Sequence, residues 1–95
     1  MTGTIRSSDG LDVRRRRILF RAWHRGMREM DLIMGRFADA MIHQLTDADL
    51  DEFEHLMQAP DPEVYRWIAG EASPPAAYDR PLFRKLCAFH RGEGA

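Results

Sequence analysis

The chain has 95 residues, of which 44% are hydrophobic and 31% are charged. That length fits one small domain, and the composition excludes a disordered tail or a membrane protein. Fourteen lysine and arginine residues face fifteen aspartate and glutamate residues, so the net charge of −1 offers nucleic acid no overall attraction. A single cysteine, Cys87, excludes an intramolecular disulfide and fits a reducing compartment.

The first ten residues combine glycine and serine with few apolar side chains, and we expect a flexible leader over residues 1–10. This segment lacks the apolar region of a secretory signal. No stretch of the chain approaches the roughly 18–20 consecutive apolar residues that a membrane-spanning helix needs. We therefore expect no contact with a membrane.

Apolar side chains begin to recur at helical spacing after Asp12, which is placed to act as an N-cap. The apolar stripe of this first helix consists of Ile18, Leu19, Ala22 and Trp23. Gly26 interrupts the pattern, so it either breaks the helix or ends it as the C′ residue.

A second helix is predicted from about Glu29 to Gln44. Its inward face consists of Met30, Ile33, Met34, Phe37, Met41 and Leu45. Gly35 lies in the middle of this pattern, where it costs about 1 kcal/mol relative to alanine. A close approach by another helix would explain a glycine at that position.

Capping signals mark the starts of the next two helices. Thr46 with Asp49 forms a capping-box variant, which predicts a third helix running to about residue 58. Asp61 is predicted to cap the fourth helix, with Pro62 at its first helical position.

The rest of the chain predicts one loop and one final helix. Gly70 ends the fourth helix, and a Pro-Pro pair argues against helix within residues 71–80. A last helix is predicted from Arg80 or Pro81 to about His90. Because no segment alternates β-branched and polar residues, we predict an all-α fold, a compact bundle of five short helices in a single domain over residues 11–92.

Three groups of residues raise the question of catalysis, metal binding or nucleic-acid binding. Arg14 to Arg17 fan around the helix at about 100° per residue, which favours a solvated helix turn over a nucleic-acid stripe and leaves a partner contact as the alternative. Glu52 and His55 have the spacing of one half of a di-metal carboxylate site, and the other half is missing. Cys87 lies near an apolar stripe without an assigned base. We expect no enzyme, no metal site and no nucleic-acid partner.

The segment RGMRE, residues 25–29, is harder to explain by structure alone. On a continuous helix Arg25 and Glu29 could pair at i, i+4 spacing for about 0.3 kcal/mol, but this leaves Gly26 unexplained. A glycine between charged residues lets another backbone approach closely, while the charges offer oriented hydrogen bonds. From the residues alone, a binding surface and a plain helix surface both stay open.

Three stretches together resemble a known family. FRAWHRGMREMDLIMGRFAD, the later LTDADLDEFEHLM and then DPEVYRWIAG follow the order found in the SdhE/Sdh5 family of succinate dehydrogenase assembly factors. The RGxxE motif of that family is matched by Arg25, Gly26 and Glu29. The resemblance covers about residues 14–70, and the tail is similar only in forming a terminal helix.

The resemblance implies a small five-helix assembly factor that is not an enzyme. It would act in the cytoplasm and bind the flavoprotein subunit of succinate dehydrogenase, with that of fumarate reductase as a further client in some bacteria. Apart from the resemblance, we expect the chain to be a monomer when free. It would promote covalent attachment of FAD to that subunit while binding no cofactor stably itself. The expected partner-binding residues are Arg25, Gly26, Met27, Arg28, Glu29 and Asp31. A small protein–protein adaptor or antitoxin-like module with a non-flavin partner is the alternative.

Overall fold

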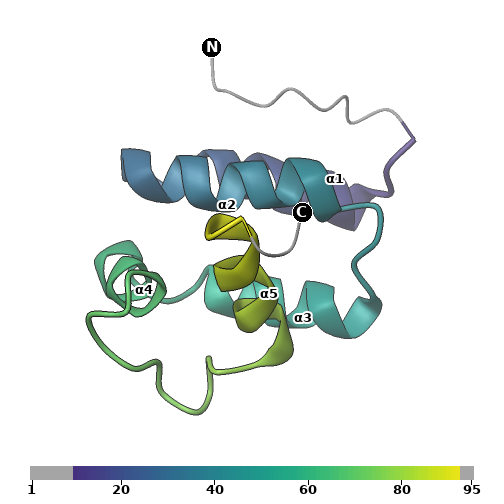
Figure 1. Ribbon diagram of the computed structural model, residues 1–95. Helices are drawn as coiled ribbons and strands as arrows, with labels where there is room; N and C mark the ends of the chain where they lie inside the picture. The colour runs from purple at the N-terminus through teal and green to yellow at the C-terminus, as the bar shows by residue number, and fades with distance from the viewer. Residues whose placement is uncertain (1–9, 93–95) are drawn as a thin grey trace. The chain divides into compact units, whose positions relative to one another are not determined.

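The computed structural model describes residues 10–92, and these residues form five α-helices and no strand (Figure 1). The helices are α1 (Val13–Trp23), α2 (Arg28–Met41), α3 (Asp47–Leu56), α4 (Asp61–Ile68) and α5 (Pro81–His90). The predicted all-α fold with five short helices is confirmed for this part of the chain. The expected flexible leader lies outside the described residues, apart from Gly10.

The helices fall into two compact units, the first ending at Leu45 and the second beginning at Thr46. The first contains α1 and α2, and the second contains α3, α4 and α5. A single domain over residues 11–92 stays a prediction. Each unit is described by itself below.

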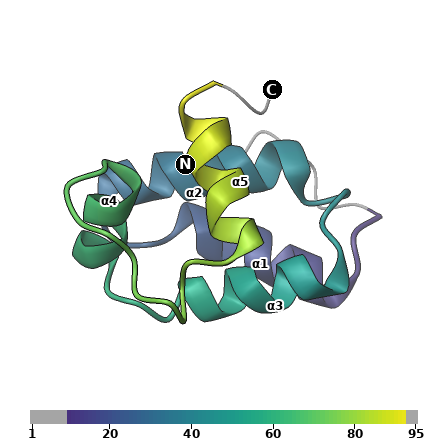
Figure 2. The same ribbon diagram turned by 60° about the horizontal axis from the view of Figure 1, so that its bottom comes forward.

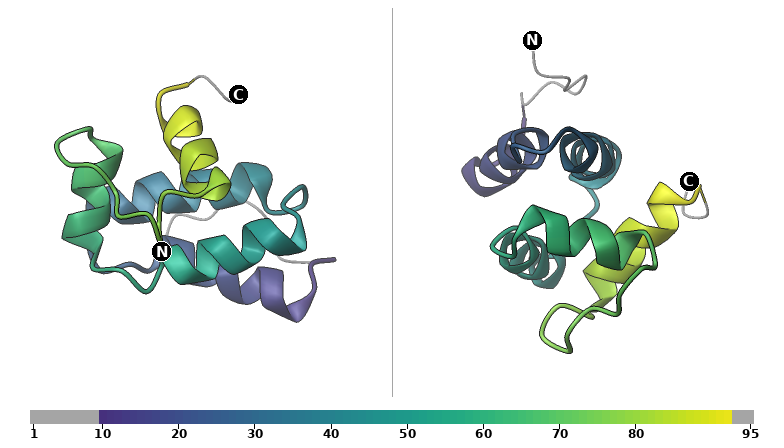
Figure 3. Two further views of the ribbon diagram at one scale, coloured as in Figure 1. Left: turned by 90° about the horizontal axis from the view of Figure 1, so that it is seen from below. Right: turned by 90° about the vertical axis from the view of Figure 1, so that its left-hand side faces the viewer.

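In the first unit, α1 and α2 form an antiparallel hairpin whose helices lie side by side (Figures 1 and 3). Asp12 caps α1 as predicted, because its carboxylate accepts the backbone N–H of Arg15 at 3.2 Å. The Arg15 guanidinium also donates to this carboxylate at 2.9 Å, and that hydrogen bond lowers the pKa of Asp12 below its usual value.

The two helices of the hairpin meet closely at Gly35. A Cβ atom added to this buried glycine would lie only 2.6 Å from the Cε2 atom of the Trp23 ring. Trp23 in turn donates its indole N–H to the buried carboxylate of Asp39 at 3.3 Å. The close helix approach that the sequence suggested for Gly35 is therefore present, with the Trp23 ring lying on α2.

In the second unit, acidic side chains of α3 hold α5, which runs across it (Figure 2). The predicted capping box is confirmed, with Thr46 and Asp49 each accepting the other's backbone N–H at 3.1 Å. Asp49 also accepts a hydrogen bond from Lys85 on α5 at 2.9 Å. Burial raises the pKa of Asp49, but the hydrogen bonds from Lys85 and Thr46 outweigh it and leave that pKa lowered.

The predicted start of α4 was wrong by one residue. Pro60, in extended conformation at φ −61° and ψ 132°, is the N-cap, and Asp61 is already helical with Pro62 after it. Proline is tolerated there because the amide groups of the first turn have no partner within the helix, and Asp61 adds a favourable negative charge at the helix N-terminus. Gly70, at φ +82°, ends α4 as predicted, and its N–H donates to the carbonyl of Trp67.

Candidate partner-binding site

Four residues, 24–27, connect α1 to α2 and contain the centre of the RGxxE motif. Helix α1 ends at Trp23 with His24 as its C-cap, so Gly26 is the second residue past the cap. Of the two predicted alternatives, Gly26 therefore lies in a break between helices and is not the C′ residue. Gly26 is exposed and has a φ of +92°. A Cβ atom added to it would meet nothing within 4 Å. The turn thus needs a glycine for its backbone conformation, and the space above it is open.

Asp31 braces this turn from the first part of α2. Its half-buried carboxylate accepts the backbone N–H of Arg25 at 2.5 Å, across six residues of sequence. The sequence analysis placed Asp31 among the expected partner-binding residues. The structure shows that this carboxylate holds the two ends of the turn together.

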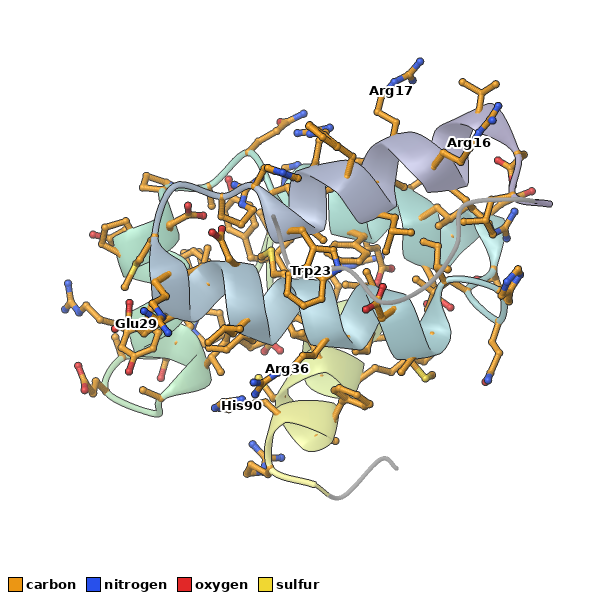
Figure 4. All side chains as sticks on the ribbon, turned by 90° about the horizontal axis from the view of Figure 1, so that it is seen from above. Arg16, Arg17, Trp23, Glu29, Arg36 and His90 are labelled. Atoms are coloured by element: carbon orange, nitrogen blue, oxygen red, sulfur yellow. The ribbon has the colours of Figure 1, made fainter. Side chains whose placement is uncertain are left out.

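The break between α1 and α2 removes the geometry that would pair Arg25 with Glu29 on a continuous helix. Glu29 and Arg28 are instead exposed in the first turn of α2, and Met27 is its half-buried N-cap without a side-chain capping bond. Figure 4 shows Glu29 at the end of the hairpin remote from Arg16 and Arg17. The RGxxE residues therefore gather around an exposed turn and the helix start that follows it.

We expect removal of the Asp31 brace to loosen the turn. Asp31→Ala leaves the Arg25 N–H without its acceptor, and we predict a loss of about 1–2 kcal/mol in the free energy of unfolding. Asp31→Asn keeps an acceptor oxygen and should lose much less. Urea unfolding measures both. If the two variants are equally unstable, the carboxylate charge matters more than the hydrogen bond.

Sequence reasoning missed the role of Arg15, which is to bind the end of α2. Its guanidinium donates to the carbonyl of Ile42 at 2.9 Å and to that of Leu45 at 2.6 Å, while it pairs with Asp12. Arg15 precedes the buried Ile18 and Leu19 by three and four residues, and this helical spacing could have revealed that it faces inward. Arg16 and Arg17 of the same run are exposed.

The sequence analysis considered Glu52 and His55 for metal binding and Cys87 for nucleophilic catalysis. Glu52 accepts the backbone N–H of Leu82 at 2.9 Å, and His55 stacks on Tyr78 with ring centroids 4.6 Å apart. Cys87 is buried, and this burial raises the pKa of its thiol, which favours the protonated form over the nucleophilic thiolate. Within residues 10–92, no three His, Cys, Asp or Glu side chains are grouped to hold a metal ion.

In the same described range, no helix is both long and apolar enough to cross a membrane.

Comparisons with known proteins agree on one family. A family model described as "Flavinator of succinate dehydrogenase", Sdh5, matches residues 16–90, which extends the resemblance beyond residue 70. The "FAD assembly factor SdhE" of Acetobacter pasteurianus is 36% identical over 80 residues, covering 84% of this chain and 73% of that protein. The protein of the same name from Coxiella burnetii is 32% identical over 62 residues, covering 65% of this chain and 76% of that protein.

A eukaryotic protein is equally similar. The "Succinate dehydrogenase assembly factor 2, mitochondrial" of Dictyostelium discoideum is 37% identical over 76 residues, covering 80% of this chain. The match covers only 53% of that protein, so the chain spans about half the length of this mitochondrial relative. No solved structure matches this one.

Proposed function

Because the chain belongs to the Sdh5 family of succinate dehydrogenase flavinators, we propose that it binds the flavoprotein subunit of that enzyme and promotes covalent attachment of FAD. The suspected family is thereby confirmed. Members of this family are assembly factors, which also confirms the prediction that the chain is not itself a catalyst.

The mechanism we propose is differential binding. The bond between FAD and the flavoprotein forms within the flavoprotein, whose domains must first close around the cofactor. A helper that binds the closed arrangement more tightly than the open one raises its population. Only a difference in affinity between the two arrangements changes their populations, because a helper that binds both equally leaves the populations as they were.

The proposed contact surface is the turn between α1 and α2. The open space above Gly26 supports a close approach by the backbone of the flavoprotein. Arg25 and Glu29 would fix its register through charge-assisted hydrogen bonds, and the exposure of Glu29 supports this role. Met27, Arg28 and Asp31 complete the surface, with Asp31 acting through its hold on the turn.

The proposal includes further points. FAD stays with the flavoprotein, and this chain binds no cofactor stably. The family resemblance adds the flavoprotein of fumarate reductase as a client in some bacteria, and a cytoplasmic location. We also propose that the chain is a monomer when free.

A pull-down followed by in-gel flavin fluorescence tests the function. The tagged chain should capture a flavoprotein, and deletion of the chain should remove the covalent fluorescence from that protein's band. Capture of a partner that never carries flavin would instead indicate an adaptor or an antitoxin-like module.

We predict that Arg25 and Glu29 act as one unit. Arg25→Ala and Glu29→Ala should each weaken binding to the flavoprotein about 5- to 30-fold, and the double variant should lose less than the product of the two. Isothermal titration of the four proteins of this cycle measures the coupling. Fully multiplicative losses would mean that the two side chains contact the partner independently.

A further inference from the structure

The side of α1 that faces away from α2 presents an unusual set of side chains. We call it the outer face of α1, and it consists of Val13, Arg16, Arg17, Phe20 and His24. At about 100° per residue these positions fall within one arc of roughly 100°, opposite the buried Ala22. Val13 and Phe20 are 58% and 62% exposed, and they are the exposed large hydrophobic side chains of the described residues.

The charge of this face is entirely positive. Helix α1, VRRRRILFRAW, contains no acidic residue, and its arginines begin in the first turn, where a positive charge opposes the helix dipole. Arg16 and Arg17 are exposed and form no ion pair within residues 10–92. Within that range, neither residue contributes to the fold through a salt bridge.

The outer face is continuous with the turn proposed to bind the flavoprotein. The Phe20 ring stacks on the His24 ring with centroids 3.9 Å apart and an interplanar angle of 18°. His24 also lies against the α1 backbone, with its Nδ1 atom 2.6 Å from the carbonyl oxygen of Phe20, and Arg25 follows it directly. In Figure 4, Trp23 lies between the two helices while Arg17 points away from α2.

We propose that the outer face of α1 is a second contact surface for the same flavoprotein. It would bind an acidic patch on the flavoprotein that also carries an apolar side chain. This inference rests on the proposed function. Arginine and aromatic side chains are the types enriched at protein interfaces, and arginine binds carboxylates in bidentate fashion. From Val13 to His24 the face extends the contact from the turn by about 16 Å along α1.

The same observations disfavour nucleic acid as the occupant. Two exposed apolar side chains lie among the arginines, and the chain as a whole has a net charge of −1. A phosphate backbone would find only Arg16 and Arg17 on this face and nothing to cover Val13 and Phe20.

Two variants test the outer face, with the wild type and a control measured beside them. Arg17→Glu should slow association with the purified flavoprotein and weaken binding about 10-fold at low salt, with a smaller effect at high salt. Phe20→Ala should speed dissociation about 10-fold at any salt concentration. Arg36→Glu, the same charge reversal at an exposed position of α2, should leave the affinity unchanged. Biolayer interferometry at several salt concentrations measures all four, and thermal unfolding checks their folding.

The inference is overturned if Arg17→Glu and Phe20→Ala both bind the flavoprotein as the wild type does. If Gly26→Arg still abolishes binding in that case, the proposed function stands and only the second surface is lost. If the wild type itself does not bind the flavoprotein, both proposals fail. Arg17→Glu is also compared with the wild type for duplex DNA binding and for self-association. If it loses either of these while it still binds the flavoprotein normally, the face belongs to another occupant and the inference is overturned.

Discussion

Gly26→Arg is expected to abolish covalent flavinylation of the flavoprotein while leaving the helical circular-dichroism signal nearly intact. The added side chain would fill the open space that the partner's backbone is proposed to enter. It would also hold an L-residue at a φ of +92°, at a cost of about 1–2 kcal/mol confined to the turn. Co-expression of the variant with the flavoprotein, followed by in-gel flavin fluorescence, measures the loss.

Two control variants separate blocked docking from backbone strain. Gly26→Ala imposes the same strain but projects only a methyl group, which meets nothing within 4 Å, so most of the flavinylation should remain. Gly70→Arg places the same side chain at another exposed glycine, at a φ of +82°, and should leave flavinylation by the folded protein unchanged. If Gly26→Ala is as damaging as Gly26→Arg, the turn's conformation and not its open space is what matters.

Arg15→Met is expected to produce the largest loss of stability, about 2–4 kcal/mol in the free energy of unfolding. Methionine can replace the aliphatic stem of Arg15 but leaves the carbonyls of Ile42 and Leu45 without their charged donor. Since these carbonyls lie at the end of α2 remote from the motif turn, flavinylation by the folded protein should persist. Urea unfolding followed by circular dichroism measures the change.

Arg16→Met is the matched control for Arg15→Met, because the two positions are neighbours and Arg16 is exposed. Its stability should change by less than about 0.5 kcal/mol. Equal losses in the two variants would show that the total positive charge of α1, and not the hydrogen bonds of Arg15, stabilises the hairpin.

Local signals predicted the helices well. The capping residues Asp12 and Thr46 act as expected because N-cap bonds need only a side-chain oxygen within three residues of an amide. Gly35 was understood as a site of close approach, since a glycine inside a helix has a cost that packing must offset. The boundary errors include one residue at Asp61 and three residues at the end of α2, which stops at Met41 and not at the predicted Gln44. Helix boundaries are where local signals are weakest.

Contacts between distant residues were harder to predict. The hydrogen bonds of Arg15 reach 27 and 30 residues along the chain, so no local spacing reveals their acceptors. The brace from Asp31 to the amide of Arg25 exists only because α1 ends before the motif, and the length of the break was not evident from the sequence. The exposed Phe20 breaks the apolar pattern of α1, and only the structure shows that it stacks on His24.

The rate of covalent flavin formation on purified flavoprotein, with excess FAD and increasing amounts of this chain, tests the central claim most directly. If the chain stabilises the productive arrangement, the rate rises with its concentration and saturates at the concentration that saturates binding. If the rate with a saturating concentration of the chain is the same as the rate without it, the account is contradicted.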